Sequence, residues 1–195
     1  MRFVTILVFA AALVAQAEEK KHVEIDTPQG KVEWKTSDGG SISRVVRDVS
    51  SGELQVLQSD AHAAVAFLAR YGPKDRGTEH PLELLDLAFA AWLLSEDPKK
   101  ESADRVIHIL GSAYGFYCIK HLGVRWAWTQ DDHGLTIALV RENPTTVGYP
   151  FSSIQYRIED RKTDFIYALY ASLDHLIKDA SEPKKPDKKS GLNTP

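Results

Sequence analysis

The sequence predicts an α+β fold that is mainly helical, with a small antiparallel sheet of about three strands at residues 124–148. Two observations carry this prediction. Apolar residues recur at helical spacing before residue 124 and after residue 152, whereas in between they alternate with polar residues. Helices therefore flank the strands on both sequence sides, and we expect one α+β domain over residues 59–180.

The composition is that of an ordinary globular protein. The chain has 195 residues, of which 43% are hydrophobic and 26% charged, and its formal net charge is −3. Nucleic acid is not expected as a partner, because phosphate binding needs a concentrated basic surface.

The first 17 residues have the pattern of a cleavable signal peptide. Arg2 precedes an apolar run at residues 3–14, and small residues at Ala15 and Ala17 form a cleavage site. A bilayer-spanning helix needs about 20 apolar residues, so a membrane anchor is the weaker alternative and no transmembrane segment is expected after cleavage. The prediction is a periplasmic or secreted protein.

Residues 18–58 form an extension before the predicted domain. Apolar and charged residues alternate on both sides of the turn residues at 27–30, which predicts a short hairpin. After a Gly/Ser-rich break at residues 37–43, the segment at 42–57 is expected to be a short strand or helix.

Three helices are expected next. Ser59 can cap a helix that runs to about Arg70, and Pro81 suits the first position of a second helix. The second helix is apolar on all sides, which predicts a central, buried position. Ser102 opens a third helix, and Gly123 ends it.

The strands and the last helices follow. Strands are expected at residues 124–129, 135–140 and 145–148, the first two forming a hairpin. Ser152 has capping-box spacing to Gln155 at the start of a short helix, and Thr163 is expected to cap the last one. Residues 181–195 are expected to be a disordered tail.

Short motifs follow one another along residues 84–177: Leu85-Asp86, Leu110-Gly111 with Gly115, Leu122-Gly123 before Trp126, Asp132 with Gly134, Pro150-Phe151-Ser152-Ser153-Ile154, and Arg157-Ile158-Glu159. In this ordered succession the segment resembles the bacterial family known as domain of unknown function 3806. The resemblance implies a fold and a domain boundary, but no activity and no catalytic residues.

Trp126 and Trp128 are the candidate binding residues. Residues two apart on a strand point to the same side, so the two indoles would form a pair. In an exported protein such a pair can stack on sugar rings or grip a partner. The alternative is that both rings fill the core between the hairpin and the helices.

Asp86 and Arg157 are the candidates for a structural ion pair. Asp86 lies in the most apolar helix, and a buried carboxylate is costly unless it is paired. We hypothesise that Arg157 pairs with it and attaches the final helices to the central one. A catalytic acid is the competing interpretation of Asp86.

No catalytic motif and no metal or cofactor site is predicted. The chain has one cysteine, Cys118, whose apolar neighbours predict a small buried thiol. We therefore expect a non-enzymatic exported binding module of unknown partner, with an envelope protein or a glycan as the candidates. The alternatives are an inhibitor or immunity-type partner of a secreted enzyme, and a small envelope hydrolase. The hydrolase would draw on Asp86, Asp104, His62, His80 and His108.

Overall fold

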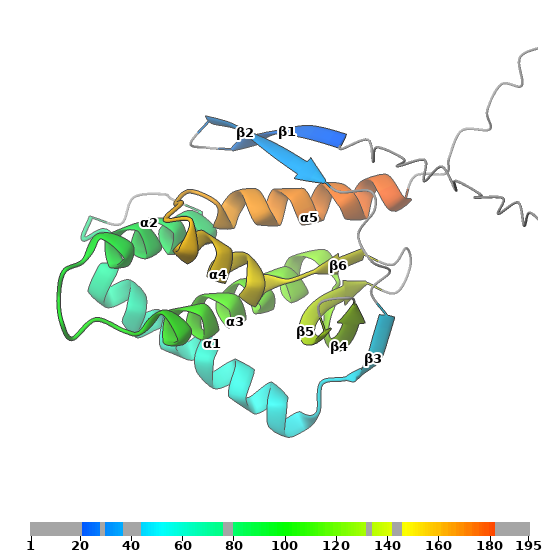
Figure 1. Cartoon of the computed structure of the whole chain (residues 1–195), viewed down its shortest axis with the longest axis horizontal. Helices are drawn as coiled ribbons and strands as arrows, with labels where there is room; N and C mark the ends of the chain where they lie inside the picture. Colours follow the sequence, from blue (N-terminus) through cyan, green and yellow to red (C-terminus); the bar gives the residue numbers. More distant parts are fainter. Residues whose placement is uncertain are drawn as a thin grey trace, which may run out of the picture.

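The computed structural model describes residues 21–27, 30–36, 44–75, 80–131, 134–141 and 146–181. Within them the chain forms five α-helices and six β-strands (Figure 1). The predicted signal peptide at residues 1–17 and nearly all of the predicted tail at 181–195 lie outside the described residues. The predicted α+β class, mainly helical, is confirmed.

The central sheet has four antiparallel strands in the order β3-β4-β5-β6. They are β3 (Arg44–Asp48), β4 (Arg125–Asp131), β5 (Gly134–Arg141) and β6 (Thr146–Gly148). The hairpin of β4 and β5 agrees with the prediction, whereas β3 adds a strand to the expected three. It lies within residues 42–57, where a short strand or helix was expected. Its partner β4 lies about eighty residues further along the chain, so no local signal shows which strand it pairs with.

A second, two-stranded sheet is formed by β1 (Lys21–Thr27) and β2 (Gly30–Thr36), as the alternation predicted. Figure 1 shows this hairpin beside the last helix, α5 (Ile166–Ser181), which β1 contacts.

The first helix, α1 (Ser51–Tyr71), begins eight residues before the predicted cap at Ser59. The true N-cap is Ser50. Its hydroxyl accepts the backbone N–H of Glu53, while the Glu53 carboxylate accepts the backbone N–H of Ser50. This capping box is visible in the sequence and is the stronger local signal, so the prediction at Ser59 was wrong.

The second and third helices follow the predictions. Helix α2 (Pro81–Leu94) is buried on most sides, and α3 (Ala103–Leu122) is capped by Ser102 and ends at Gly123, whose φ is 65°. Figure 1 shows α3 between α1 and α5, with the four-stranded sheet at one end of the helices. None of the helices in the described part of the chain is long and apolar enough to cross a bilayer.

Two glycines of α3 leave space for aromatic rings to pack against the helix. A side chain at Gly111 would collide with the Phe151 ring, and one at Gly115 with the Trp126 indole. The two rings are themselves stacked, with centroids 5.7 Å apart. Rings from α4 (Pro150–Glu159) and β4 therefore come close to the backbone of α3 at these glycines.

The last two helices begin at other residues than predicted. Helix α4 (Pro150–Glu159) starts before Ser152, which lies in its first turn, and the Gln155 amide donates to Glu159. Helix α5 starts three residues after Thr163. Its first N–H groups bind a carboxylate from another helix, described below, so neither predicted cap is correct.

Candidate ligand-binding site

A cavity of about 500 Å³ lies between the start of β5 and one face of α4. This volume is within the range of small-molecule binding sites. It is lined by three consecutive residues of β5, by the residue before α4 and by three residues of α4: Gly134, Leu135, Thr136, Tyr149, Ser152, Ser153 and Tyr156.

The helical side of the cavity follows from the spacing of its residues. Tyr149, Ser152, Ser153 and Tyr156 stand at positions i, i+3, i+4 and i+7, which form one face of a helix. Ile154, on the other side, is buried in the core. The core thus holds α4 in place from behind and turns the tyrosines and serines toward the cavity.

The lining is rich in hydroxyl groups. Within the described part of the chain, no hydrogen bond occupies the side-chain hydroxyls of Thr136, Ser152, Ser153 and Tyr156. Tyr156 is 64% exposed, and Leu135, which lines the same cavity, is 55% exposed. A hydroxyl both donates and accepts a hydrogen bond, so the cavity offers either role to a ligand.

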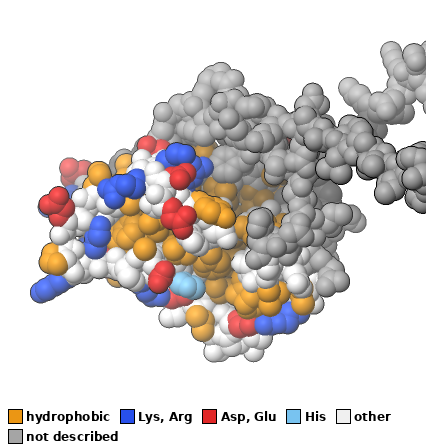
Figure 2. All heavy atoms as spheres, viewed as in Figure 1, with side chains coloured by type: hydrophobic (Ala, Val, Ile, Leu, Met, Phe, Trp, Pro, Cys, Tyr) orange, Lys and Arg blue, Asp and Glu red, His pale blue; other side chains and the backbone are white. Residues whose placement is uncertain are grey.

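A second, smaller cavity of about 190 Å³ adjoins the first. The two share Tyr149 and Ser153 as a common wall. The rest of the smaller cavity is mostly apolar and is built by α3, β6 and α5: Tyr114, Val147, Gly148, Leu169, Ser172, Leu173 and Leu176. In the view of Figure 2, hydrophobic side chains gather over the middle of the face on which Figure 1 places α4 and the strands.

Two polar side chains at the smaller cavity are buried: Tyr114, which lines it, and Cys118, which lies next to Tyr114. Tyr114 is 2% exposed, and burial raises the pKa of its phenol well above the usual range. Cys118 lies beside it, fully buried, and burial raises the pKa of the thiol to about 12. The thiol therefore stays protonated and is no nucleophile, and the prediction of a buried thiol is confirmed.

The two predicted binding residues, Trp126 and Trp128, lie in different surroundings. Trp126 is 5% exposed, and its ring packs between Gly115 and Phe151. Trp128 is half-buried and donates its indole N–H to Glu53 at 3.1 Å. Neither is among the described residues that line the two cavities. A binding role for the pair stays a prediction, and it would require the Trp126 ring to leave the core.

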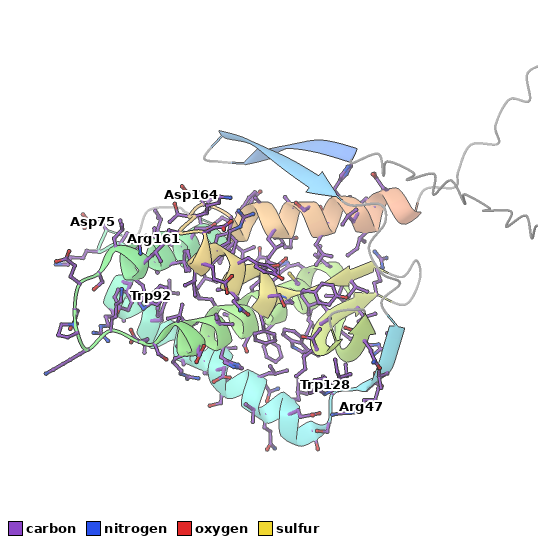
Figure 3. The ribbon with its side chains drawn as sticks, in the orientation of Figure 1. Arg47, Asp75, Trp92, Trp128, Arg161 and Asp164 are labelled. Carbon is purple, nitrogen blue, oxygen red and sulfur yellow. The ribbon has the colours of Figure 1, made fainter. Side chains whose placement is uncertain are left out.

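Trp128 belongs to a polar network that joins β3, β4 and α1. The Arg47 guanidinium lies 5.1 Å from the centroid of the indole, and Figure 3 shows the two side chains together at the end of the molecule where β3 meets α1. Arg47 also donates two hydrogen bonds to Glu53, at 2.7 and 2.9 Å. These bonds, and then those from Ser50, hold the pKa of Glu53 far below its usual range.

Asp86 of α2 is buried, with 1% of its surface exposed. Its carboxylate accepts the backbone N–H groups of Phe165 and Ile166 at 2.9 and 2.8 Å, and that of Tyr167 at 3.0 Å. Asp86 therefore caps the N-terminus of α5. Burial raises the pKa of this carboxyl, although the three N–H groups act to lower it.

Arg157, the predicted partner of Asp86, stands on α4 with its guanidinium 5.5 Å from the centroid of the Phe165 ring. Phe165 is itself one of the residues whose N–H binds Asp86. The predicted ion pair stays a prediction. The role proposed for it, attaching the last helices to the central one, is performed at α5 by the backbone contacts of Asp86.

The residues named for a hydrolase are spread over the helices. His108 lies 3.9 Å from Asp60, which also pairs with Arg105. His80 caps α2 and contacts the Tyr117 hydroxyl at 2.8 Å. Among the described residues, no three histidine, cysteine, aspartate or glutamate side chains form a group that could hold a metal ion.

No family model, no curated protein and no solved structure matches this chain. The cavities therefore have to be interpreted from their own chemistry. Sequence reasoning missed them, although the spacing of Tyr149, Ser152, Ser153 and Tyr156 was a usable signal. The other wall, formed by the start of β5, comes to lie beside this helix face only in the folded chain.

Proposed function

We propose that this protein is a non-enzymatic binding module whose larger cavity takes a neutral carbohydrate. The observation that carries the proposal is the cavity of about 500 Å³ with hydroxyl groups from both β5 and α4. If residues 1–17 act as the predicted export signal, the protein would meet such ligands in the periplasm or outside the cell.

The chemistry of the lining supports a sugar. A sugar offers alternating hydroxyls, which need partners that both donate and accept, and Thr136, Ser152 and Ser153 provide such partners. Sugar rings also have apolar faces that pack on aromatic side chains, and the exposed ring of Tyr156 is available at the rim. The described lining residues carry no charged side chain, which matches a neutral ligand.

The alternatives have less support. No observation on the described residues specifically favours the hydrolase or the inhibitor, and both stay predictions. The resemblance to the domain of unknown function 3806 also remains a proposal, and it would bring a fold without an activity.

The test uses the protein purified after export by its own signal. Saturation-transfer NMR would measure binding of the methyl glycosides of glucose, galactose, mannose and N-acetylglucosamine. We expect at least one to bind, and the double variant Ser152→Ala/Ser153→Ala to lose that binding. Ser51→Ala, at an exposed first-turn serine of α1, is the matched control and should bind as the wild type does.

Two outcomes would contradict the proposal. One is that none of the four glycosides binds to a folded protein. The other is that binding persists unchanged when Ser152, Ser153 and Tyr156 are all replaced by alanine, which would place the ligand elsewhere.

A further inference from the structure

We infer that the ligand is amphipathic: a neutral sugar that carries an alkyl or acyl chain, with the sugar in the larger cavity and the start of the chain in the smaller one. This inference rests on the proposed function and specifies its ligand class. It comes from the contrast between two cavities that share a wall.

The shared wall sets the geometry. Tyr149 and Ser153 line both cavities, so the two cavities adjoin at these side chains. A single molecule that passes Tyr149 and Ser153 would occupy both, with a polar part in the larger cavity and a narrow apolar part in the smaller one.

The lining of the smaller cavity specifies an apolar occupant. Leu169, Leu173 and Leu176 line it from α5, and Val147 lines it from β6. The hydroxyl of Ser172 is already engaged, donating to the carbonyl of Ala168 at 2.7 Å. Water in this cavity would find few partners, and its replacement by hydrocarbon is favourable.

The size of the cavity limits the occupant to part of a chain. A cavity of about 150 Å³ lined by apolar side chains is large enough for benzene. The smaller cavity here measures about 190 Å³, so it has room for the first few methylenes of a chain. Leu176, which lines this cavity, is 38% exposed, so the remainder of a longer chain would leave the cavity past this side chain.

A chain linked to a sugar accounts for both cavities at once, whereas a free sugar or a single apolar side chain of a protein partner accounts for only one. Each methylene that enters the smaller cavity should strengthen binding about fourfold, which corresponds to ~0.8 kcal/mol.

The experiment compares methyl and hexyl β-glucoside by isothermal titration calorimetry, below the concentration at which the hexyl compound forms micelles. We expect the hexyl compound to bind at least tenfold more tightly. Leu176→Ser should remove most of that gain and leave methyl glucoside binding unchanged. Leu94→Ser, at a leucine that is 72% exposed on α2, is the matched control and should preserve the gain.

The outcomes separate this inference from the proposed function. Equal affinity for the two glucosides would overturn the inference and leave the carbohydrate site standing. A hexyl gain that survives Leu176→Ser would overturn the assignment of the chain to the smaller cavity. Hexyl binding that depends on Leu176 but not on Ser152 and Ser153 would support the apolar site and overturn the sugar site. If neither glucoside binds, the same comparison is made with the methyl and hexyl glycosides of galactose, mannose and N-acetylglucosamine, and failure of all of them to bind would overturn both.

Discussion

A carboxylate takes part in capping the N-termini of both α1 and α5, but the two carboxylates come from different places. At α1 the cap is local, because Glu53 lies three residues after Ser50 and its carboxylate accepts the Ser50 N–H at 2.8 Å. At α5 the cap comes from α2, because Asp86 precedes the N–H groups it binds by about eighty residues.

The pKa values of the two groups move in opposite directions. Glu53 is partly exposed, and the bonds from Arg47 lower its pKa. Asp86 is almost fully buried, and the loss of water raises its pKa even though it accepts three N–H bonds. The comparison teaches that three hydrogen bonds need not offset the loss of water around a buried carboxylate.

The largest expected effect comes from removing the buried cap. Asp86→Ala leaves two buried N–H groups and one half-buried N–H group without their acceptor, and each buried orphaned group costs about 1–3 kcal/mol. Relief of the buried charge offsets part of this, so we expect a loss of about 3 kcal/mol in the free energy of unfolding. Chemical denaturation followed by circular dichroism would measure it.

Asp86→Asn is the control for this variant, because its amide oxygen can still accept the N–H groups of Phe165 and Ile166. It should be more stable than Asp86→Ala and less stable than the wild type. An alanine variant as stable as the wild type would show that the α5 N-terminus does not depend on Asp86.

Asp86 and Glu53 should affect the pH dependence of the free energy of unfolding in opposite directions. Since the folded state raises the pKa of Asp86 above 3.8, the native protein holds this proton more tightly than the unfolded chain. The stability that this proton contributes is therefore fully present below about pH 4 and is lost as the pH rises through the raised pKa.

For Glu53, whose folded pKa is lowered from 4.5, stability is present above that value and is lost as the pH falls. Unfolding curves of the wild type and Asp86→Asn, recorded from acid to neutral pH, would measure the Asp86 contribution. A stability advantage of the wild type that grows with rising pH would contradict the raised pKa of Asp86.

A smaller effect is expected at the local cap. Ser50→Ala removes the hydroxyl that accepts the Glu53 N–H, and the loss of such an N-cap costs about 1 kcal/mol. Ser59→Ala is the control, since Ser59 lies within α1 and has no cap to lose. Equal losses from both variants in thermal unfolding would argue that Ser50 does not cap the helix.

The smallest effect is expected from Glu53→Gln, which keeps an acceptor for the Ser50 N–H and removes the charge that Arg47 binds. Exposed ion pairs contribute little and are screened by salt. The difference in melting temperature from the wild type should be small at low salt and should shrink further at high salt. A difference that does not change with salt would show that the Arg47 pair is not its source.

Local patterns predicted the elements whose signals lie within one turn. Ser102 and Gly123 bound α3 as expected, Pro81 begins α2, and β4 and β5 pair as the predicted hairpin. The start of α1 could also have been predicted from the sequence, because the capping box of Ser50 and Glu53 is a local motif.

The candidate site was predictable only on its helical side. Tyr149, Ser152, Ser153 and Tyr156 have a spacing that places them on one helix face, but nothing local shows that this face lines a cavity. The spacing of Ser152 and Gln155 instead indicates a helix cap. A serine three residues before a glutamine has the same local pattern whether it caps the helix or lies in its first turn and lines a cavity.

By itself the sequence determined the fold class, the start of α2, both ends of α3 and the central hairpin, because each depends on capping and periodicity over a few residues. Only the tertiary structure decided the fourth strand, the cap of α5 by Asp86, the burial of Trp126 and the two adjoining cavities. The physical reason is that desolvation, long-range strand pairing and shared walls depend on which distant segments meet, and no short stretch of sequence contains that information.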